Sequence, residues 1–255
     1  MYPIIFTQLE PRIGFGWTTR VIAFIVLATQ IIPNIFMKVR VRPAQRRKMI
    51  DWSAFREPPY VLFIIGGFLG FMALYVPFFY IQLFSLHRDI TTDSFTFYIL
   101  PIINAASILG RIFPNMLADR IGPLNMIVPC GILSGILTLS LISVDSLAGI
   151  LVFCIFFGFF SGTFVSLPPT VFVTLSPKRS IVGTRMGMGF AIVAFSLLIG
   201  TPIAGQILRS STSADGSADG FVGVWIFGGC LILGGSLFMG LARGTKVGWR
   251  ITAKG

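Results

Sequence analysis

The amino-acid sequence predicts an all-α integral membrane protein with seven transmembrane helices. The chain of 255 residues is 55% hydrophobic and only 11% charged, and its mean hydropathy is +0.87. Soluble domains do not have such a composition. Several stretches without a charged residue also reach the length of about 18 residues that a spanning helix needs. These stretches are 121–144, 146–177, 186–208 and 221–242.

The positive charge of the chain is explained by topology. The net charge is +11, but the lysines and arginines lie in short connections between the apolar runs, as the positive-inside rule requires. This distribution indicates a lipid bilayer as partner and argues against nucleic acid. The three cysteines lie inside apolar runs without a CxxC pair or a neighbouring histidine: they are Cys130, Cys154 and Cys230. We therefore expect no disulfide framework, no metal site and no cofactor.

Seven apolar segments define the spans, and four regions of the chain follow from them. The predicted spans are 15–37, 60–86, 95–117, 124–144, 146–175, 185–208 and 221–242. Residues 1–14 have no signal-peptide features, so region 1–37 is expected to hold the end of a preceding helix and one span. A basic loop at 38–59, a six-helix part at 60–242 and a tail at 243–255 complete the organisation.

Counts of lysine plus arginine orient these spans. The connections at 38–59, 118–123, 176–185 and 243–255 carry 7, 1, 3 and 4 of these residues, whereas those at 87–94, 145 and 209–220 carry 1, 0 and 1. The more basic side is expected to be cytoplasmic. The N-terminus should then be outside and the C-terminus cytoplasmic, in a multi-pass protein of the plasma membrane. The basic loop at 38–59 is interpreted as a topology determinant, with recognition of lipid headgroups as the less favoured alternative.

Trp17 and Arg20 stand near the start of the first span. A tryptophan in this position is typical of an interface anchor. Arg20 either lines a cavity or anchors the helix in the outer leaflet beside the tryptophan, and we favour the anchor.

The second span contains an aromatic stretch around a proline, from Tyr75 through Pro77 to Tyr80. Proline removes a backbone donor, so we expect a bend here. The two tyrosines either shape a substrate-binding cavity or belong to an aromatic belt at the membrane interface, and the sequence leaves both alternatives open. The only histidine, His87, follows in a loop without a ligand cluster and is assigned no chemistry.

The third span carries polar residues inside an apolar helix. Asn104, Ser107 and Arg111 are spaced by three and four residues, so they are expected on one helical face. Arg111 lies about eight residues before the charged turn that follows the span. If that turn marks the membrane edge, Arg111 is roughly 12 Å below it at helical rise. That is near the middle of a hydrocarbon core about 30 Å thick. An arginine at this depth usually faces a polar cavity or a partner; the alternative is a side chain that snorkels to the headgroups.

Glycine pairs predict close helix contacts. Gly-x-x-x-Gly patterns begin at Gly66, Gly131 and Gly158, and such patterns let two helix backbones approach. We expect these faces to need helices that this chain does not contain.

Prolines predict two helix interruptions. The first is expected at Pro168 and Pro169 in the fifth span, and the second at Gly200 and Pro202 in the sixth. Each proline removes one backbone donor from the helix.

The turn between the third and fourth spans contains a recognisable loop motif. The sequence from Asn115 to Pro123 resembles the cytoplasmic loop motif of the major facilitator superfamily, and its Asp119, Arg120 and Gly122 match that motif. The resemblance implies that these residues serve gating and topology. The alternative is ordinary loop capping, in which the carboxylate of Asp119 accepts backbone donors at the start of the next helix.

A longer run resembles the monocarboxylate porter family of that superfamily, especially its fungal members. The matching residues include Gly110-Arg111-x-x-Pro114, Ser176-Pro177-x-Arg179 and Leu198-x-Gly200-Thr201-Pro202-x-x-Gly205. The resemblance covers nearly the whole chain. It implies the last helix of an N-terminal half followed by the six-helix C-terminal half of the major facilitator fold, with the rest of the N-terminal half as a missing partner. It also implies transport by alternating access.

The resemblance implies that Arg111 recognises a substrate carboxylate. From their positions in the sequence, Asn104 and Ser107 on the polar stripe and Tyr75 and Tyr80 at the bend are the further candidate binding residues. The aspartate that usually accompanies the arginine falls on Ser107, which sets this chain apart from proton-coupled lactate carriers. All nine acidic residues lie in loops or at the ends of spans. The partner of Arg111 is therefore a bound anion, neighbouring polar groups or an acid of the missing half.

We expect secondary active or facilitative transport of a small organic solute, most simply a monocarboxylate or related organic anion, with or without a coupled proton. A membrane receptor or scaffold that does not transport is the alternative. An enzyme is not expected, since the spans contain no His, Asp or Glu for catalysis.

Overall fold

The computed structural model describes residues 2–38, 49–212 and 220–248, and the chain divides into a first unit, 1–46, and a second unit, 47–255. The first unit contains the helix α1, Tyr2–Phe36, in which Gly14 leaves helical geometry with φ of +76°. Positive φ is accessible to glycine without steric cost. The described residues contain seven helices long and apolar enough to cross a membrane, which confirms the predicted all-α membrane class.

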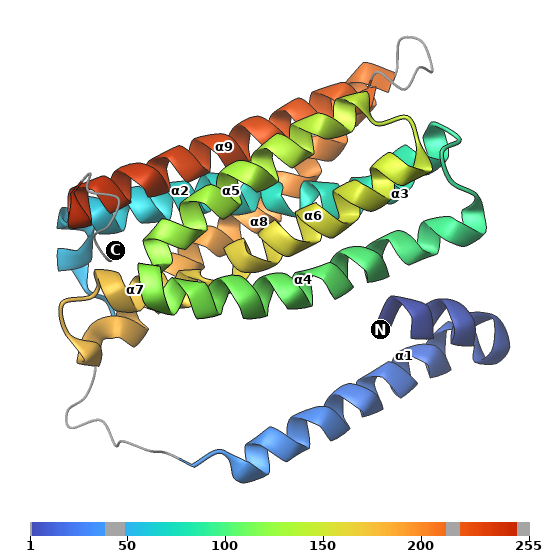
Figure 1. Ribbon diagram of the computed structural model, residues 1–255. Helices are drawn as coiled ribbons and strands as arrows, with labels where there is room; N and C mark the ends of the chain where they lie inside the picture. Colours follow the sequence, from blue (N-terminus) through green and yellow to red (C-terminus); the bar gives the residue numbers. More distant parts are fainter. Residues whose placement is uncertain (1, 39–48, 213–219, 249–255) are drawn as a thin grey trace. The chain divides into compact units, whose positions relative to one another are not determined.

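The second unit is a bundle in which six of these spans pack together (Figure 1). Its α-helices are α2 Pro58–Leu74, α3 Val76–His87, α4 Asp93–Ile121, α5 Pro123–Ser140, α6 Leu147–Ser166, α7 Pro168–Leu175, α8 Val182–Thr212 and α9 Gly220–Val247. Short 3₁₀ helices are η1 Trp52–Arg56, η2 Leu141–Ser143 and η3 Arg179–Ile181. Among the main contacts, α2 packs on α9 and α8, α4 packs on α6, and α5 packs on α9 and α6.

Prolines divide two of the spans. The second span turns at Tyr75, between α2 and α3, and the fifth breaks at Leu167, immediately before Pro168 and Pro169 start α7. At the start of a helix the missing donor of proline would have no intrahelical acceptor, so the prolines are well placed there.

The sixth span differs from the expectation. Helix α8 runs through Gly200 and Pro202 without an interruption. A Cβ on Gly200 would lie 1.8 Å from the carbonyl oxygen of Met72, so α8 lies directly against the backbone of α2 here. Transmembrane helices tolerate proline where neighbouring helices support the backbone. The tight packing explains why the helix continues through its proline.

The glycine patterns find their partners inside the second unit. A Cβ on Gly66 of α2 would lie 2.6 Å from the carbonyl oxygen of Gly235 on α9, and one on Gly131 of α5 would lie 2.3 Å from the hydroxyl of Ser236, also on α9. Gly158 of α6 faces α4, where a Cβ would lie 2.4 Å from the carbonyl oxygen of Ile103. The expectation that these faces need helices outside the chain was wrong, because pairing within the bundle already uses them.

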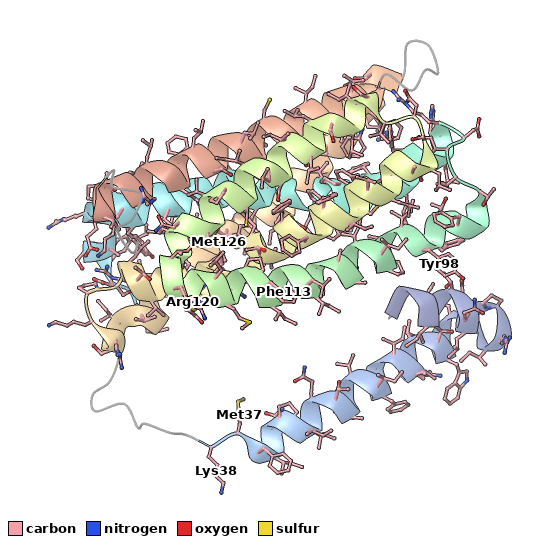
Figure 2. The ribbon with its side chains drawn as sticks, viewed as in Figure 1. Met37, Lys38, Tyr98, Phe113, Arg120 and Met126 are labelled. Carbon is pink, nitrogen blue, oxygen red and sulfur yellow. The ribbon has the colours of Figure 1, made fainter. Side chains whose placement is uncertain are left out.

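Two helices of the second unit are less buried than the others. Buried residues make up 28% of the most apolar stretch in the span containing α4 and 22% in the span containing α8, against 39–56% in the other four spans. Side chains such as Phe113 on α4 and Leu198 on α8 are 61% and 70% exposed. Figure 2 shows the side chains of Tyr98, Phe113 and Arg120 along α4. The open surface of the unit therefore lies mainly on α4 and α8.

Candidate functional site

Arg111 lies on the exposed side of α4. Its side chain is solvent-accessible in the isolated chain, and within the described residues it forms no ion pair. Its neighbours one turn before and one residue after, Ile108 and Ile112, are 59% and 49% exposed. The guanidinium therefore stands on a largely apolar surface, where an unpaired cation is costly unless a polar partner covers it.

The other two polar residues of this stripe differ in burial. Asn104 is exposed and its amide donates to the carbonyl of Leu100 at 2.9 Å. Ser107 is only 5% exposed, and its hydroxyl donates to the carbonyl of Asn104 at 2.7 Å. The expected common face is therefore split: Asn104 and Arg111 lie on the open surface, and Ser107 is packed away from it.

Close packing of α4 on α6 causes this split. A Cβ on Gly162 of α6 would lie 2.7 Å from the carbonyl oxygen of Ser107, and one on Gly110 would lie 1.9 Å from that of Phe159. The hydroxyl of Thr163 donates to the carbonyl of Gly110 at 2.7 Å. The backbone just before Arg111 is thus pressed against α6, which directs the next residue outward.

The two tyrosines of the second span have different surroundings. Tyr80 on α3 donates its hydroxyl to the carbonyl of Thr201 on α8 at 3.0 Å, and that hydroxyl would lie 2.7 Å from a Cβ on Gly205. Tyr75 is half-buried at the bend and its ring lies 5.5 Å from that of Phe78. The structure thus brings Tyr80 together with the glycine-proline segment of α8. Among the described residues, neither tyrosine forms a hydrogen bond or a cation–π contact with Arg111.

The break at Leu167 is tied to α4. The amide of Asn115, one turn after Arg111, donates to the hydroxyl of Ser166 at 3.0 Å. Pro168 is buried and Pro169 half-buried at the start of α7. The interrupted span therefore contacts α4 close to Arg111.

The turn after α4 contains the residues that match the loop motif. Gly122 has φ of +101°, a conformation that residues with a side chain rarely adopt. Asp119 and Arg120 are exposed in the last turn of α4, and they line a groove of about 430 Å³ with Phe113, Met116 and Leu117. Helix α5 has Gly122 at its N-cap, and a glycine has no side chain that could cap the helix. The role of Asp119 stays a prediction.

A second arginine, Arg185 on α8, forms a cluster that the sequence did not reveal. It is 1% exposed, and its two terminal nitrogens donate to both oxygens of Glu57 at 2.7 and 2.6 Å. Its Nε donates to Asp51 at 2.9 Å. Tyr60 donates its hydroxyl to the Arg185 carbonyl at 2.8 Å. The carboxylates lie 134 and 128 residues before Arg185 in the chain, so no local spacing signals the cluster.

The cluster lowers the pKa of both carboxyl groups. The pKa of Asp51 is lowered, first by the hydrogen bond from Ser53 and then by Arg185. The pKa of Glu57 is lowered by its hydrogen bonds from Arg185, against the opposing effect of burial. Two-pronged pairing of guanidinium and carboxylate is among the strongest charge-assisted hydrogen bonds. The cluster therefore ties the segment before α2 to the first turns of α8.

Comparison with known proteins identifies relatives for nearly the whole chain, although no family model matches it. The sequence is 44% identical over 229 residues to the MFS-type transporter dbaD of Emericella nidulans, covering 90% of this chain and 50% of that protein. Its relatives are MFS-type transporters.

Two further relatives carry names that describe efflux. The aspyridones efflux protein apdF of Emericella nidulans is 32% identical over 97% of this chain and 48% of its own length. The agnestins efflux protein AgnL12 of Paecilomyces divaricatus is 34% identical over 95% of this chain and 54% of its own length. The chain spans about half the length of these curated relatives. The relatives support membrane transport, and none of these three names gives a monocarboxylate.

Proposed function

We propose that this chain is the C-terminal part of a major facilitator transporter that moves a small organic anion across a membrane by alternating access. In this proposal α1 is the last helix of an N-terminal half, and the second unit is the six-helix C-terminal half. The relatives support the transporter class, because they are MFS-type transporters about twice as long as this chain. The open surface on α4 and α8 supports the need for a further set of helices.

The proposal of an anionic substrate rests on the position of Arg111. This arginine is exposed on an apolar surface and has no ion-pair partner among the described residues. A guanidinium recognises a carboxylate with two parallel hydrogen bonds. Monocarboxylates and related organic anions are the first substrates to test, and the two relatives named for efflux make export the first direction to test.

The remaining parts of the proposal concern topology. The end of the unit that holds the α4–α5 turn and the end of α9 is assigned to the cytoplasm of a plasma-membrane protein, with the N-terminus outside (Figure 1). Asp119, Arg120 and Gly122 are assigned to gating at that end. Coupling to a proton, if present, would use acids outside the described spans or in the other half.

Substitution of Arg111 in the full-length protein tests the substrate site. We expect Arg111→Gln to leave folding and surface delivery intact and to abolish transport of anionic substrate in cells or proteoliposomes. Arg111→Lys should restore transport only in part, because an ammonium group cannot make the two-pronged bond.

Arg20→Gln is the matched control. The guanidinium of Arg20 lies 5.0 Å from the ring centre of Trp17 on α1, the geometry of a cation–π contact. Its loss should reduce transport much less than the loss of Arg111. Unchanged transport by Arg111→Gln at normal surface expression would show that the snorkelling alternative was correct and that the substrate binds elsewhere.

A further inference from the structure

The short 3₁₀ helix η1 and its flanking residues present three chemically different faces. In a 3₁₀ helix the side chains three residues apart lie above one another. Helix η1 itself spans only Trp52–Arg56, and the residues from Met49 to Glu57 fall into three rows by their contacts and their exposure.

The first row faces the protein. Asp51 and Glu57 bind Arg185, and Ala54, midway between them, is fully buried. The backbone N–H of Asp51 also contacts the sulfur of Met188 on α8 at 3.3 Å. This row fixes the orientation of the whole segment relative to α8.

The second row is apolar and exposed. Met49, Trp52 and Phe55 are 92%, 73% and 39% exposed, and the rings of Trp52 and Phe55 lie 6.1 Å apart. Ile50, which precedes η1 and is in line with Ser53 and Arg56 at a spacing of three, is 50% exposed. Such a concentration of large apolar side chains on a segment outside the spans marks an interaction surface.

Within η1 the third row is polar and exposed. It consists of Ser53, whose backbone N–H donates to Asp51 at 3.2 Å, and Arg56 in the last turn of η1. The charges of Asp51, Glu57, Arg56 and Arg185 sum to zero, so the feature of this segment that differs from the basic residues before it is the apolar row.

The position of η1 identifies that surface. Helix α2 begins at Pro58, directly after Glu57, and the span Pro58–His87 has 30 residues. At helical rise this is at most about 45 Å, because the span turns at Tyr75, and a bilayer with its headgroups is about 40–45 Å thick. The start of α2 thus lies at headgroup level, where tryptophan is enriched because its ring is apolar and its N–H is polar.

We propose that η1 is a membrane-interface anchor: Met49, Trp52 and Phe55 insert among the lipid headgroups beside α2, and the Arg185 cluster holds the segment in that orientation. The surface it fits is the interfacial layer of the bilayer, and binding needs no anionic lipid. The anchor would fix the height and rotation of the start of α2 and, through Arg185, of α8.

Spin labels in the full-length protein test this proposal. A cysteine-free background in phosphatidylcholine vesicles without anionic lipid receives one label through Trp52→Cys or, as the matched control on the polar row, through Arg56→Cys. At residue 52 we expect collisions with lipid-soluble oxygen to exceed those with a water-soluble nickel chelate several-fold, and the reverse at residue 56. Equal exposure of both labels to the nickel chelate would overturn the proposal. So would protection of residue 52 from both reagents, since that would show a protein covering it.

The role of the cluster is tested by its removal. Arg185→Gln alone leaves two carboxylates without their partner and carries a risk of misfolding. The combined variant Arg185→Met, Asp51→Asn and Glu57→Gln removes the cluster without leaving a charge behind. We expect residue 52 in this variant to become several-fold more accessible to the nickel chelate. Unchanged lipid exposure there would overturn the role assigned to Arg185.

Discussion

Two arginines of the second unit show how differently the same side chain is accommodated. Arg111 stands on the open surface of α4 and forms no ion pair among the described residues, whereas Arg185 at the start of α8 is buried and binds two carboxylates. A cation whose partners lie in the same chain contributes to structure. A cation presented on an apolar surface without such partners is available to something outside the described residues. The contacts of Arg185 indicate a role in stability, and recognition by Arg111 stays a proposal.

The largest effect on the free energy of unfolding is expected from substitution of Arg185. Arg185→Gln should lower the free energy of unfolding by about 2–4 kcal/mol, somewhat below the value for a fully buried pair because water can reach Glu57. Thermal unfolding of the full-length protein in detergent measures this loss. Arg111→Gln, made in parallel, should leave the unfolding temperature nearly unchanged. A similar loss in both variants would remove the distinction between the two arginines.

An intermediate effect is expected at the glycine that precedes Arg111. Gly110→Ala places a Cβ against the Phe159 carbonyl, so α4 must move away from α6. A loss of about 1–3 kcal/mol follows for such overpacking, together with impaired transport because Arg111 is displaced. Gly187→Ala on α8 is the control, since a Cβ there meets no atom within 4 Å. If both substitutions are tolerated equally, the contact between α4 and α6 does not position Arg111.

The smallest effect concerns the contact of α3 with α8. Tyr80→Phe removes the hydroxyl that donates to the carbonyl of Thr201. Hydrogen bonds between transmembrane helices contribute about 0.6 kcal/mol on average, so the unfolding temperature should fall only slightly. The exposed Tyr98 on α4 provides a control, and Tyr98→Phe should not change it. A transport defect in Tyr80→Phe beyond this small loss would favour the cavity interpretation of the tyrosine.

The fold class followed from the sequence because hydropathy and span length report directly on the membrane. The predicted sixth span, 185–208, corresponds to α8, Val182–Thr212, and the bend at Tyr75 and the break at Pro168 occur where proline indicated them. The continuous helix at Pro202 could not be predicted, because it depends on packing against Met72, which is distant in sequence.

The candidate site was predictable only in part. Periodicity placed Asn104, Ser107 and Arg111 within a narrow arc of α4, but it could not show that Gly162 of α6 would cover Ser107 and leave the other two exposed. The Arg185 cluster escaped prediction altogether. Asp51 and Glu57 lie in the 38–59 loop, which was interpreted as a topology determinant because of its basic residues. Only the folded chain brings these two carboxylates to Arg185 on α8.

The pairing of α2 with α9 and of Glu57 with Arg185 has a consequence for biosynthesis. The ribosome makes α2 long before α8 and α9, yet α2 finds its glycine-lined contact at Gly235 and its charge partner at Arg185 only when those helices arrive. Until then, α2 lacks the contact between Gly66 and Gly235, and the carboxylates of Asp51 and Glu57 lack their arginine partner. Completion of the half is a late event, and a product that stops before α8 leaves the first helix of the bundle exposed to membrane quality control.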